Sequence, residues 1–382
     1  MKRVVLLRSN PVNPDPPVEK MANTLLRNGY EVTIVAWDRS TNESCVSTKV
    51  HFVDGVADIT RFGIKATYGG GLKKTLPSLL KFQYMLLKWL IQNRRQYDII
   101  HAFDFDTGFV ASICTRMFRK KLVYHILDYY IASHDLVDHP LGKLVERAEI
   151  GVINRADATI ICTEKRREQI CKATPHNLFV IHNTPNDQII DNECVTKMGD
   201  GDKASLVFVG TFGGERFLRE AVSVIKNRND VELHIAGFGE LEKFVEAEAI
   251  ANDNIYYYGR LSYEKTLALE NQCDVMFAMY TPAIPNHRYA APNKFYESLM
   301  LGKPIIMARD TGFDDIIISN GIGEIAEYNT ESFNNALDRL LSNREHWLRI
   351  KKIARDMYEE RFSWNIMEKR ILDIYSEVGC AK

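Results

Sequence analysis

Short apolar runs alternate with helix-length segments along nearly the whole chain, and this alternation constrains the fold more than any other feature. Such a pattern is typical of a parallel sheet covered by helices. In the first half, a helix is expected over Val18–Asn28, with Gly29 ending it. The strands expected there are Arg3–Arg8, Glu31–Ala36, Asp98–Phe103, Leu122–Ile126, Ala158–Cys162 and Leu178–Ile181.

The alternation stops once and then starts again. Residues 185–204 are polar, contain two glycines and lack periodicity, so they predict an interdomain linker. Five more strands follow, in the runs SLVFVG, VELHIAG, NIYYYG, DVMFAMY and KPIIMA. Because 382 residues exceed one ordinary core, we expect an α/β protein with two Rossmann-like domains, 1–184 and 205–360. A last helix, Trp364–Val378 within 361–382, is expected to cross back toward the first domain.

Composition narrows the functional classes. The formal net charge of −1 gives no overall attraction to nucleic acid, so no nucleic-acid partner is expected. The seven cysteines are scattered and form no CxxC pair, which favours free thiols in the cytoplasm. The sequence shows neither a signal peptide at its start nor a run typical of a transmembrane helix. One local imbalance stands out: residues 61–95 contain eight Lys or Arg and no Asp or Glu.

The stretch APNKFYESLMLGKPIIMA carries the clearest chemical pattern. Pro292 stands at the start of an expected helix, and Lys294 and Glu297, three apart, share one face of it. A helix N-terminus with a lysine in its first turn suits a phosphate, and Asn293 lies in the same turn. Glu297 could accept hydrogen bonds from ribose hydroxyls. An amphipathic surface helix with an ordinary ion pair remains the alternative.

This stretch resembles the donor-site helix of family 4 (GT4) glycosyltransferases, in which the run P-x-K-x-x-E-x-x-x-x-G-K-P is common. The resemblance covers nearly the whole chain, and the order and spacing of its motifs carry it. The first domain contributes DPPVEKMANTLLRNGYEVTIVAWDR, YDIIHAFDFDTG, KLVYHILDYY, NRADATIICTEKRREQI and LFVIHNTPN. The second contributes VGTFGGERFLREAV, ELHIAGFGELEKF, IYYYGRLSYEKTLALENQCDVMFAMY and FSW.

The resemblance implies a GT-B fold, with two Rossmann-like domains facing each other across a cleft. It implies that Lys294 holds the donor diphosphate, that Glu297 holds the ribose, and that Arg216 opposes the leaving diphosphate. Gly210 and Gly213 would let the backbone approach phosphate closely. Arg260 is expected near the nucleotide base.

The chain departs from the family pattern at two positions. Thr211 replaces a frequent arginine, and Tyr289 replaces a frequent second glutamate. The second departure leaves the identity of the donor sugar open, and the nearby His287 and Arg288 are either substitutes or a plain polar loop.

In the first half, the candidate residues follow two strands. Asp128 is expected to face the cleft and bind an acceptor hydroxyl, with a structural carboxylate as the alternative. His101 is a second catalytic candidate, although a packed histidine is the commoner interpretation of such a position. Asp104 and Asp106 have the D-x-D spacing of a Mn²⁺ site, but a structural or acceptor-side role is favoured. We expect no bound metal and no other cofactor.

A basic amphipathic helix is expected in GGGLKKTLPSLLKFQYMLLKWLIQNRR. Lys74, Lys81, Lys88 and Arg95 recur every seven residues and share a face. Such a helix suits an anionic membrane surface, at which Phe82 and Trp89 could sit. A core-packed helix with a solvated basic side is the alternative.

Together these features predict a glycosyltransferase. It would move a sugar from a UDP- or GDP-linked donor to a hydroxyl of a lipid-linked or polysaccharide-precursor acceptor, at the inner face of the cytoplasmic membrane. The resemblance implies retention of anomeric configuration. Two other functions stay open: a sugar-nucleotide 2-epimerase of the same architecture, and a catalytically degenerate partner subunit.

Overall fold

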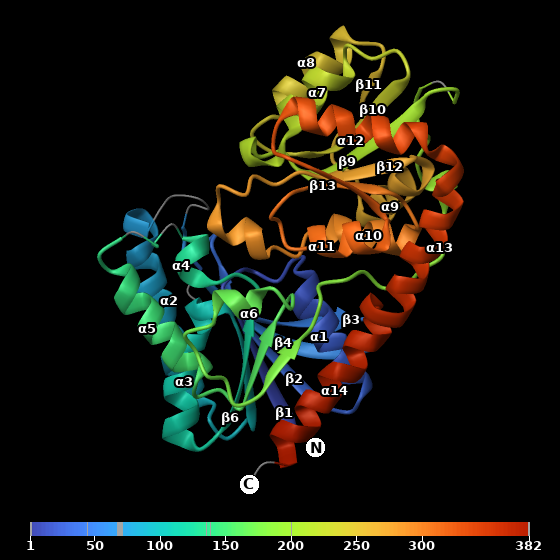
Figure 1. Cartoon of the computed structure of the whole chain (residues 1–382). Helices are drawn as coiled ribbons and strands as arrows, with labels where there is room; N and C mark the ends of the chain where they lie inside the picture. The colour runs from blue at the N-terminus through green and yellow to red at the C-terminus, as the bar shows by residue number, and fades with distance from the viewer. Residues whose placement is uncertain are drawn as a thin grey trace. The chain divides into compact units, whose positions relative to one another are not determined.

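The computed structural model describes residues 2–43, 45–66, 72–134, 136–137, 139–199 and 201–380, without the side chains of residues 72–74. The chain divides into two compact units (Figure 1). The first unit comprises Met1–His182 and Met367–Lys382, and the second comprises Asn183–Ile366. Among the described residues, no helix has the length and apolarity needed to cross a membrane.

The first unit is built on an eight-stranded sheet of order β3-β4-β2-β1-β5-β6-β7-β8, in which only the β3–β4 pairing is antiparallel. Its strands are β1 (Arg3–Arg8), β2 (Glu31–Asp38), β3 (Val46–Phe52), β4 (Gly55–Gly63), β5 (Ile99–Phe103), β6 (Lys121–Ile126), β7 (Ala158–Ile161) and β8 (Leu178–Val180). Its helices are α1 (Pro16–Arg27), α2 (Leu72–Gln92), α3 (Asp104–Phe118), α4 (Tyr130–Ser133), α5 (Gly142–Ile153), α6 (Arg166–Gln169) and, from Met367 on, α14 (Trp364–Cys380).

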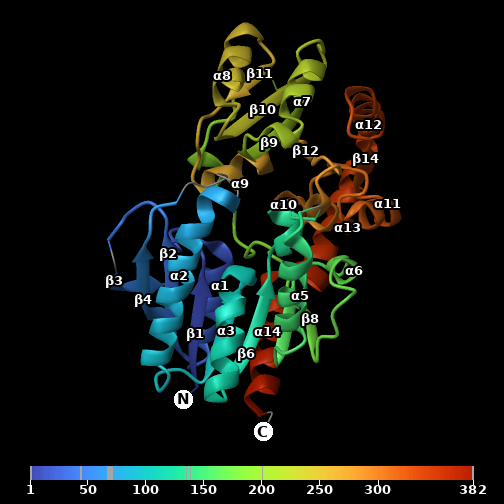
Figure 2. The same cartoon turned by 90° about the vertical axis from the view of Figure 1, so that its left-hand side faces the viewer.

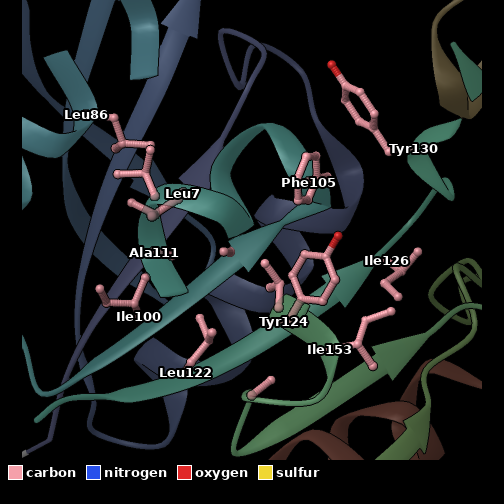
Figure 3. Packing of buried hydrophobic residues seen from close by; sticks show 14 of the residues in the cluster. Leu7, Leu86, Ile100, Phe105, Ala111, Leu122, Tyr124, Ile126, Tyr130 and Ile153 are labelled. Carbon is pink, nitrogen blue, oxygen red and sulfur yellow. The ribbon is translucent and has the colours of Figure 1, made fainter. Parts of the chain in front are cut away.

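Helices cover both faces of this sheet, which explains why its central strands β1 and β5 are buried and largely apolar. On one face, α2, α3 and α5 pack over residues such as Leu7, Ile100 and Leu122 (Figure 3). On the other face lie α1 and α14 (Figures 1 and 2). The helix α14 buries Ile371 and Tyr375 there.

The apolar side of α2 faces this core. Phe82 is fully buried and stacks on Trp37, with ring centres 4.9 Å apart, and Trp89 is partly buried against the same cluster. The expectation that Phe82 sits at a membrane interface is therefore wrong, because the residues that give the helix its apolar periodicity are the ones that the sheet covers. Residues 67–71 and the side chain of Lys74 lie outside the described residues.

The second unit has a six-stranded parallel sheet of order β11-β10-β9-β12-β13-β14. Its strands are β9 (Ala204–Thr211), β10 (Val231–Phe238), β11 (Ile255–Tyr257), β12 (Val275–Ala278), β13 (Ile305–Ala308) and β14 (Gly323–Ala326). Its helices are α7 (Leu218–Ile225), α8 (Glu242–Ala251), α9 (Tyr263–Gln272), α10 (Asn293–Leu301), α11 (Asp314–Asn320), α12 (Thr330–Ser342) and α13 (Trp347–Met357).

Two apolar clusters flank this second sheet. One includes α7 and α12, and the other includes α9, α10 and α13. The polar stretch 185–204 packs on this unit, where the Tyr358 hydroxyl donates to the Pro185 carbonyl oxygen and Arg355 pairs with Asp187. A π-helical turn, Tyr358–Phe362, joins α13 to α14.

Candidate active site

In the second unit, Lys294 lies against the end of β9. It lies in the first turn of α10, which begins directly after Pro292. Lys294 is only 8% exposed. Its Nζ lies 4.6 Å from the centre of the Phe208 ring and 2.9 Å from the position that a β-carbon on Gly210 would take. The ammonium group therefore occupies space that exists because residue 210 has no side chain.

The ends of β9 and β10 approach each other closely through glycines. Gly210 and Gly237 have φ values of +145° and +146°, which other residues rarely adopt. A β-carbon on Gly237 would fall 1.9 Å from the carbonyl oxygen of Gly210. Glycine at position 237 therefore lets the two strand ends approach each other closely, next to the positive charge of Lys294.

Glu297 lies one turn further along α10 and is 5% exposed. Tyr263, at the start of α9, hydrogen-bonds to its carboxylate, and burial together with that carboxylate raises the pKa of Tyr263 above its usual range. The structure thus keeps Lys294 and Glu297 on one helix face, as their spacing predicts.

Sequence reasoning missed a third charged residue here, Glu270 of α9. It is 1% exposed, and its Oε2 has no hydrogen-bond partner among the described residues. Burial and the charge of Glu297 raise the pKa of Glu270 well above its ordinary value, while Lys294 opposes this shift. Glu270 and Tyr263 are seven residues apart on α9, so helical spacing could have paired them, but the run IYYYGRLSYEKTLALENQCDVMFAMY that contains both gave neither a role.

Arg216 lies in the loop after β9, as expected, but it is already paired. Its Nε donates to Oε1 of the adjacent Glu215 at 3.1 Å, and its guanidinium lies 4.0 Å from the centre of the Tyr280 ring. A β-carbon on Gly213 would fall 2.4 Å from the Glu215 carboxylate. Glu215, to which the run VGTFGGERFLREAV gave no role, therefore partly neutralises the cation expected to oppose a diphosphate.

The remaining candidates of the second unit have varied surroundings. Arg260 stacks on Phe238, with its guanidinium carbon 4.3 Å from the ring centre. Asn293 is exposed and accepts a hydrogen bond from Asn183 at 3.1 Å. His287 and Arg288 both contact their own loop, through the carbonyl oxygens of Thr281 and Pro282.

In the first unit, a buried ion cluster holds the strand ends together. Arg8, the last residue of β1, pairs with Asp15 and Asp104. Burial opposes the charge of Arg8, but these two carboxylates raise the pKa of Arg8 above its usual range. Asp104 has a left-handed φ of +58°, uncommon for a residue with a side chain, and this turn aims its carboxylate at the end of β6.

Asp104 positions Asp128. Oδ1 of Asp104 accepts hydrogen bonds from the backbone N–H groups of Leu127 and Asp128, at 2.9 and 3.1 Å. The Asp128 side chain is 58% exposed, and its carboxylate lies 3.8 Å from the guanidinium of the buried Arg166. The first unit thus presents one accessible carboxylate beside a fixed positive charge at the carboxyl end of β6.

His101 does not share this exposure. It is fully buried, with Nδ1 2.7 Å from the Tyr375 hydroxyl of α14 and Nε2 3.3 Å from Nδ1 of His125. Burial lowers the pKa of His101 to about 3, so the ring is neutral at physiological pH. This placement argues against the catalytic role expected of His101, because its two ring nitrogens are engaged inside the unit, where they join α14 to the sheet.

Asp104 and Asp106 do not converge as a D-x-D metal site would. The oxygens of Asp104 are taken by Arg8 and two backbone N–H groups, whereas Asp106 lies 3.9 Å from Arg39 and hydrogen-bonds to Tyr130. Among the residues that the structure describes, no group of three or more His, Cys, Asp or Glu is placed to hold a metal.

Comparison with known families covers both units. Residues 16–184 match the model of the glycosyl transferase 4-like domain, and residues 198–357 match that of glycosyl transferases group 1. The chain is a GT4-like glycosyltransferase with the GT-B fold. An uncharacterized glycosyltransferase of Methanocaldococcus jannaschii is 24% identical to this transferase over 317 residues, covering 80% of the chain and 84% of the relative.

Solved structures agree on the fold of the transferase. Sucrose-phosphate synthase from Thermosynechococcus elongatus is similar with a TM-score of 0.72 and 14% identity, covering 100% of both chains. Anabaena HepE, solved in complex with UDP, has a TM-score of 0.67 and 15% identity, covering 98% of this chain and 100% of its own.

Proposed function

We propose that the transferase moves a sugar from a UDP- or GDP-linked donor and holds the donor diphosphate with Lys294, beside the glycine-lined end of β9. The single observation that carries this proposal is the contact between the Lys294 ammonium and the space above Gly210. The complex of HepE with UDP supports a nucleotide donor by analogy.

In this proposal the two units divide the chemistry. Lys294, Arg216 and the N-terminus of α10 stabilise the negative charge that develops on the leaving diphosphate. Glu297 accepts hydrogen bonds from the ribose, and the exposed Asp128 binds the acceptor hydroxyl. Gly210, Gly213, Asn293 and Arg260 complete the donor site. The resemblance to GT4 enzymes supports retention of configuration without a bound metal.

The proposed acceptor is a hydroxyl on a lipid-linked or polysaccharide-precursor molecule, met at the inner face of the cytoplasmic membrane. Lys81, Lys88 and Arg95 support this location, because they are exposed in a segment that contains no acid. Basic side chains of this kind are attracted by anionic lipids, with a range set by the Debye length.

Product analysis with a panel of nucleotide sugars tests the proposal. A transferase releases UDP or GDP and delivers the sugar to an acceptor or, slowly, to water. Formation of the epimeric nucleotide sugar would instead establish a 2-epimerase, and binding without turnover would establish a degenerate partner subunit. Either of those outcomes overturns the proposed transfer.

A further inference from the structure

The outer surface of three neighbouring helices of the first unit carries exposed apolar side chains. The helix α2 packs on α3, which packs on α5, and the three lie side by side in Figure 2. The exposed side chains are Leu76, Leu80 and Tyr84 on α2, Phe109, Ile113 and Met117 on α3, and Leu144 on α5. On α2 and α3 they recur every four residues, so each set forms a stripe along its helix.

These stripes are distinct from the core-facing sides of the same helices. Phe82, Leu86 and Leu90 of α2 are fully buried, and so are Ala111 and Cys114 of α3. The stripes therefore add a second apolar face to helices that already have one. Exposed apolar side chains gathered on neighbouring helices point to interaction with a protein or a membrane.

The charges around the stripes are basic. Exposed lysines and arginines flank them on all three helices: Lys81, Lys88, Arg116, Lys143 and Arg147. The acidic side chains of these helices do not add negative charge to this surface. Asp106 and Glu149 are buried, and Asp104 and Glu146 form ion pairs with Arg8 and Lys172. An apolar surface with a purely basic exposed rim is complementary to anionic phospholipid.

A hollow in the same surface is lined by both apolar and basic side chains. Its volume is about 460 Å³, and Ser112, Ile113, Arg116, Met117 and Arg155 line it. Two guanidinium groups thus stand beside two apolar side chains, an arrangement that fits a phosphate head group with the first carbons of its acyl chains.

We propose that the outer face of α2, α3 and α5 inserts into an anionic membrane surface, with Leu80, Tyr84, Ile113, Met117 and Leu144 below the head groups. Attachment then has an electrostatic part, which salt removes, and a hydrophobic part, which salt leaves in place. The basic side chains of residues 61–95 alone would give only the electrostatic part. This proposal rests on the proposed function, because membrane attachment would bring the transferase to a lipid-linked acceptor.

Flotation of the full chain with phosphatidylglycerol-containing vesicles tests this, at low and at high salt. The wild type should retain a fraction of its binding at high salt. The double change Ile113→Ser and Met117→Ser should weaken that fraction at least about tenfold, because two apolar side chains no longer enter the lipid. The change of Lys81 and Lys88 to Glu should weaken mainly the low-salt binding.

Two exposed residues of the second unit provide a matched control. Ile318 and Leu348 are 58% and 81% exposed, and changing both to Ser should leave vesicle binding unchanged. Complete release of the wild type at high salt would overturn the inference, as would unchanged binding of the Ile113 and Met117 variant. If the wild type is a dimer that does not bind vesicles, and the Ile113 and Met117 variant is a monomer, this face is instead a contact between copies of the chain, and the inference is overturned. Donor hydrolysis without vesicles is measured separately, so that loss of transferase function is distinguished from loss of insertion.

Discussion

The ammonium group of Lys294 lies 2.9 Å from the point where a side chain on Gly210 would begin. The change Gly210→Ala should therefore displace Lys294 and strain a backbone held at a φ of +145°. We expect UDP to bind roughly tenfold more weakly, corresponding to ~1.4 kcal/mol, as measured by calorimetry.

A nearby glycine provides the control for this change. A β-carbon on Gly214 would meet no heavy atom within 4 Å, and the φ of this residue is not positive. The change Gly214→Ala should leave UDP affinity within about twofold of the wild type. Equal affinities of the Gly210→Ala variant and the wild type would remove this strand end from the donor site.

Lys294 and Glu297 should contribute differently to donor binding. The change Lys294→Ala should weaken UDP binding about 10- to 100-fold and barely affect uridine, because only the diphosphate meets the ammonium group. The change Glu297→Ala should weaken both ligands, since both carry the ribose. Calorimetry with the two ligands separates these effects, and small, equal losses in all four titrations would contradict the assignment.

Glu215 should restrain the donor affinity of the free transferase. Its carboxylate pairs with Arg216 at 3.1 Å, so a diphosphate must compete with it for that cation. The change Glu215→Gln should strengthen UDP binding by a few-fold, in keeping with ~1 kcal/mol or less for a partly exposed ion pair. Arg216→Gln should remove this gain in the double variant, and persistence of the gain would show that Glu215 acts elsewhere.

Sugar transfer should survive EDTA. The Asp104 carboxylate is occupied by Arg8 and by the N–H groups that hold Asp128, so it is not available as a metal ligand without dismantling the cluster. Activity is measured with and without Mn²⁺ after chelation. A strict Mn²⁺ requirement that Asp106→Asn abolishes would contradict this expectation.

Stability should fall as the pH rises toward 8, in part because of Glu149. Burial raises the pKa of Glu149 from 4.5 to about 8, and the Tyr124 hydroxyl donates to its Oε1 at 2.9 Å. The contribution of Glu149 to the free energy of unfolding is fully present below pH 4.5 and is lost as the pH rises through 8. Between these two values Glu149 ionises in the unfolded chain but stays protonated in the folded one.

The change Glu149→Gln should therefore flatten the pH dependence of the free energy of unfolding, which this one group can steepen by up to about 1.4 kcal/mol per pH unit. Urea unfolding between pH 5 and about 8 measures the slope. Glu146→Gln on the same helix, where the carboxylate pairs with Lys172, should leave the slope as it is. A variant slope identical to that of the wild type would contradict the raised pKa.

The central strands of both sheets were predictable from the sequence, whereas β3, β4 and β14, which lie at or next to a sheet edge, were missed. The strand Arg3–Arg8 occurs where its apolar run predicts it, because helices cover both of its sides. The edge strand Val46–Phe52 was missed, since it is mostly exposed and carries little apolar signal. Val53 and Asp54 form the two-residue turn that joins it to β4, which begins at Gly55.

The site divides in the same way. The spacing of Lys294 and Glu297 predicts a shared helix face because both belong to one helix. Glu270 could not be found similarly, since its importance comes from its position beside Glu297 of a different helix. Glu215 is adjacent to Arg216 in the sequence, but adjacency alone does not predict that the two side chains pair. The apolar stripe of α3 escaped notice because its exposed and buried residues together make the helix apolar nearly all round.

The return of α14 to the first unit has a consequence for synthesis. The side chain that covers His101 belongs to Tyr375, so the sheet of residues 1–182 leaves the ribosome without its last cover. At about 5–20 residues per second, translation of Asn183–Ile366 occupies on the order of tens of seconds. Throughout that interval the nascent first unit lacks the cover that α14 gives to this face of its sheet, and transiently exposed apolar surface of this kind is prone to aggregation.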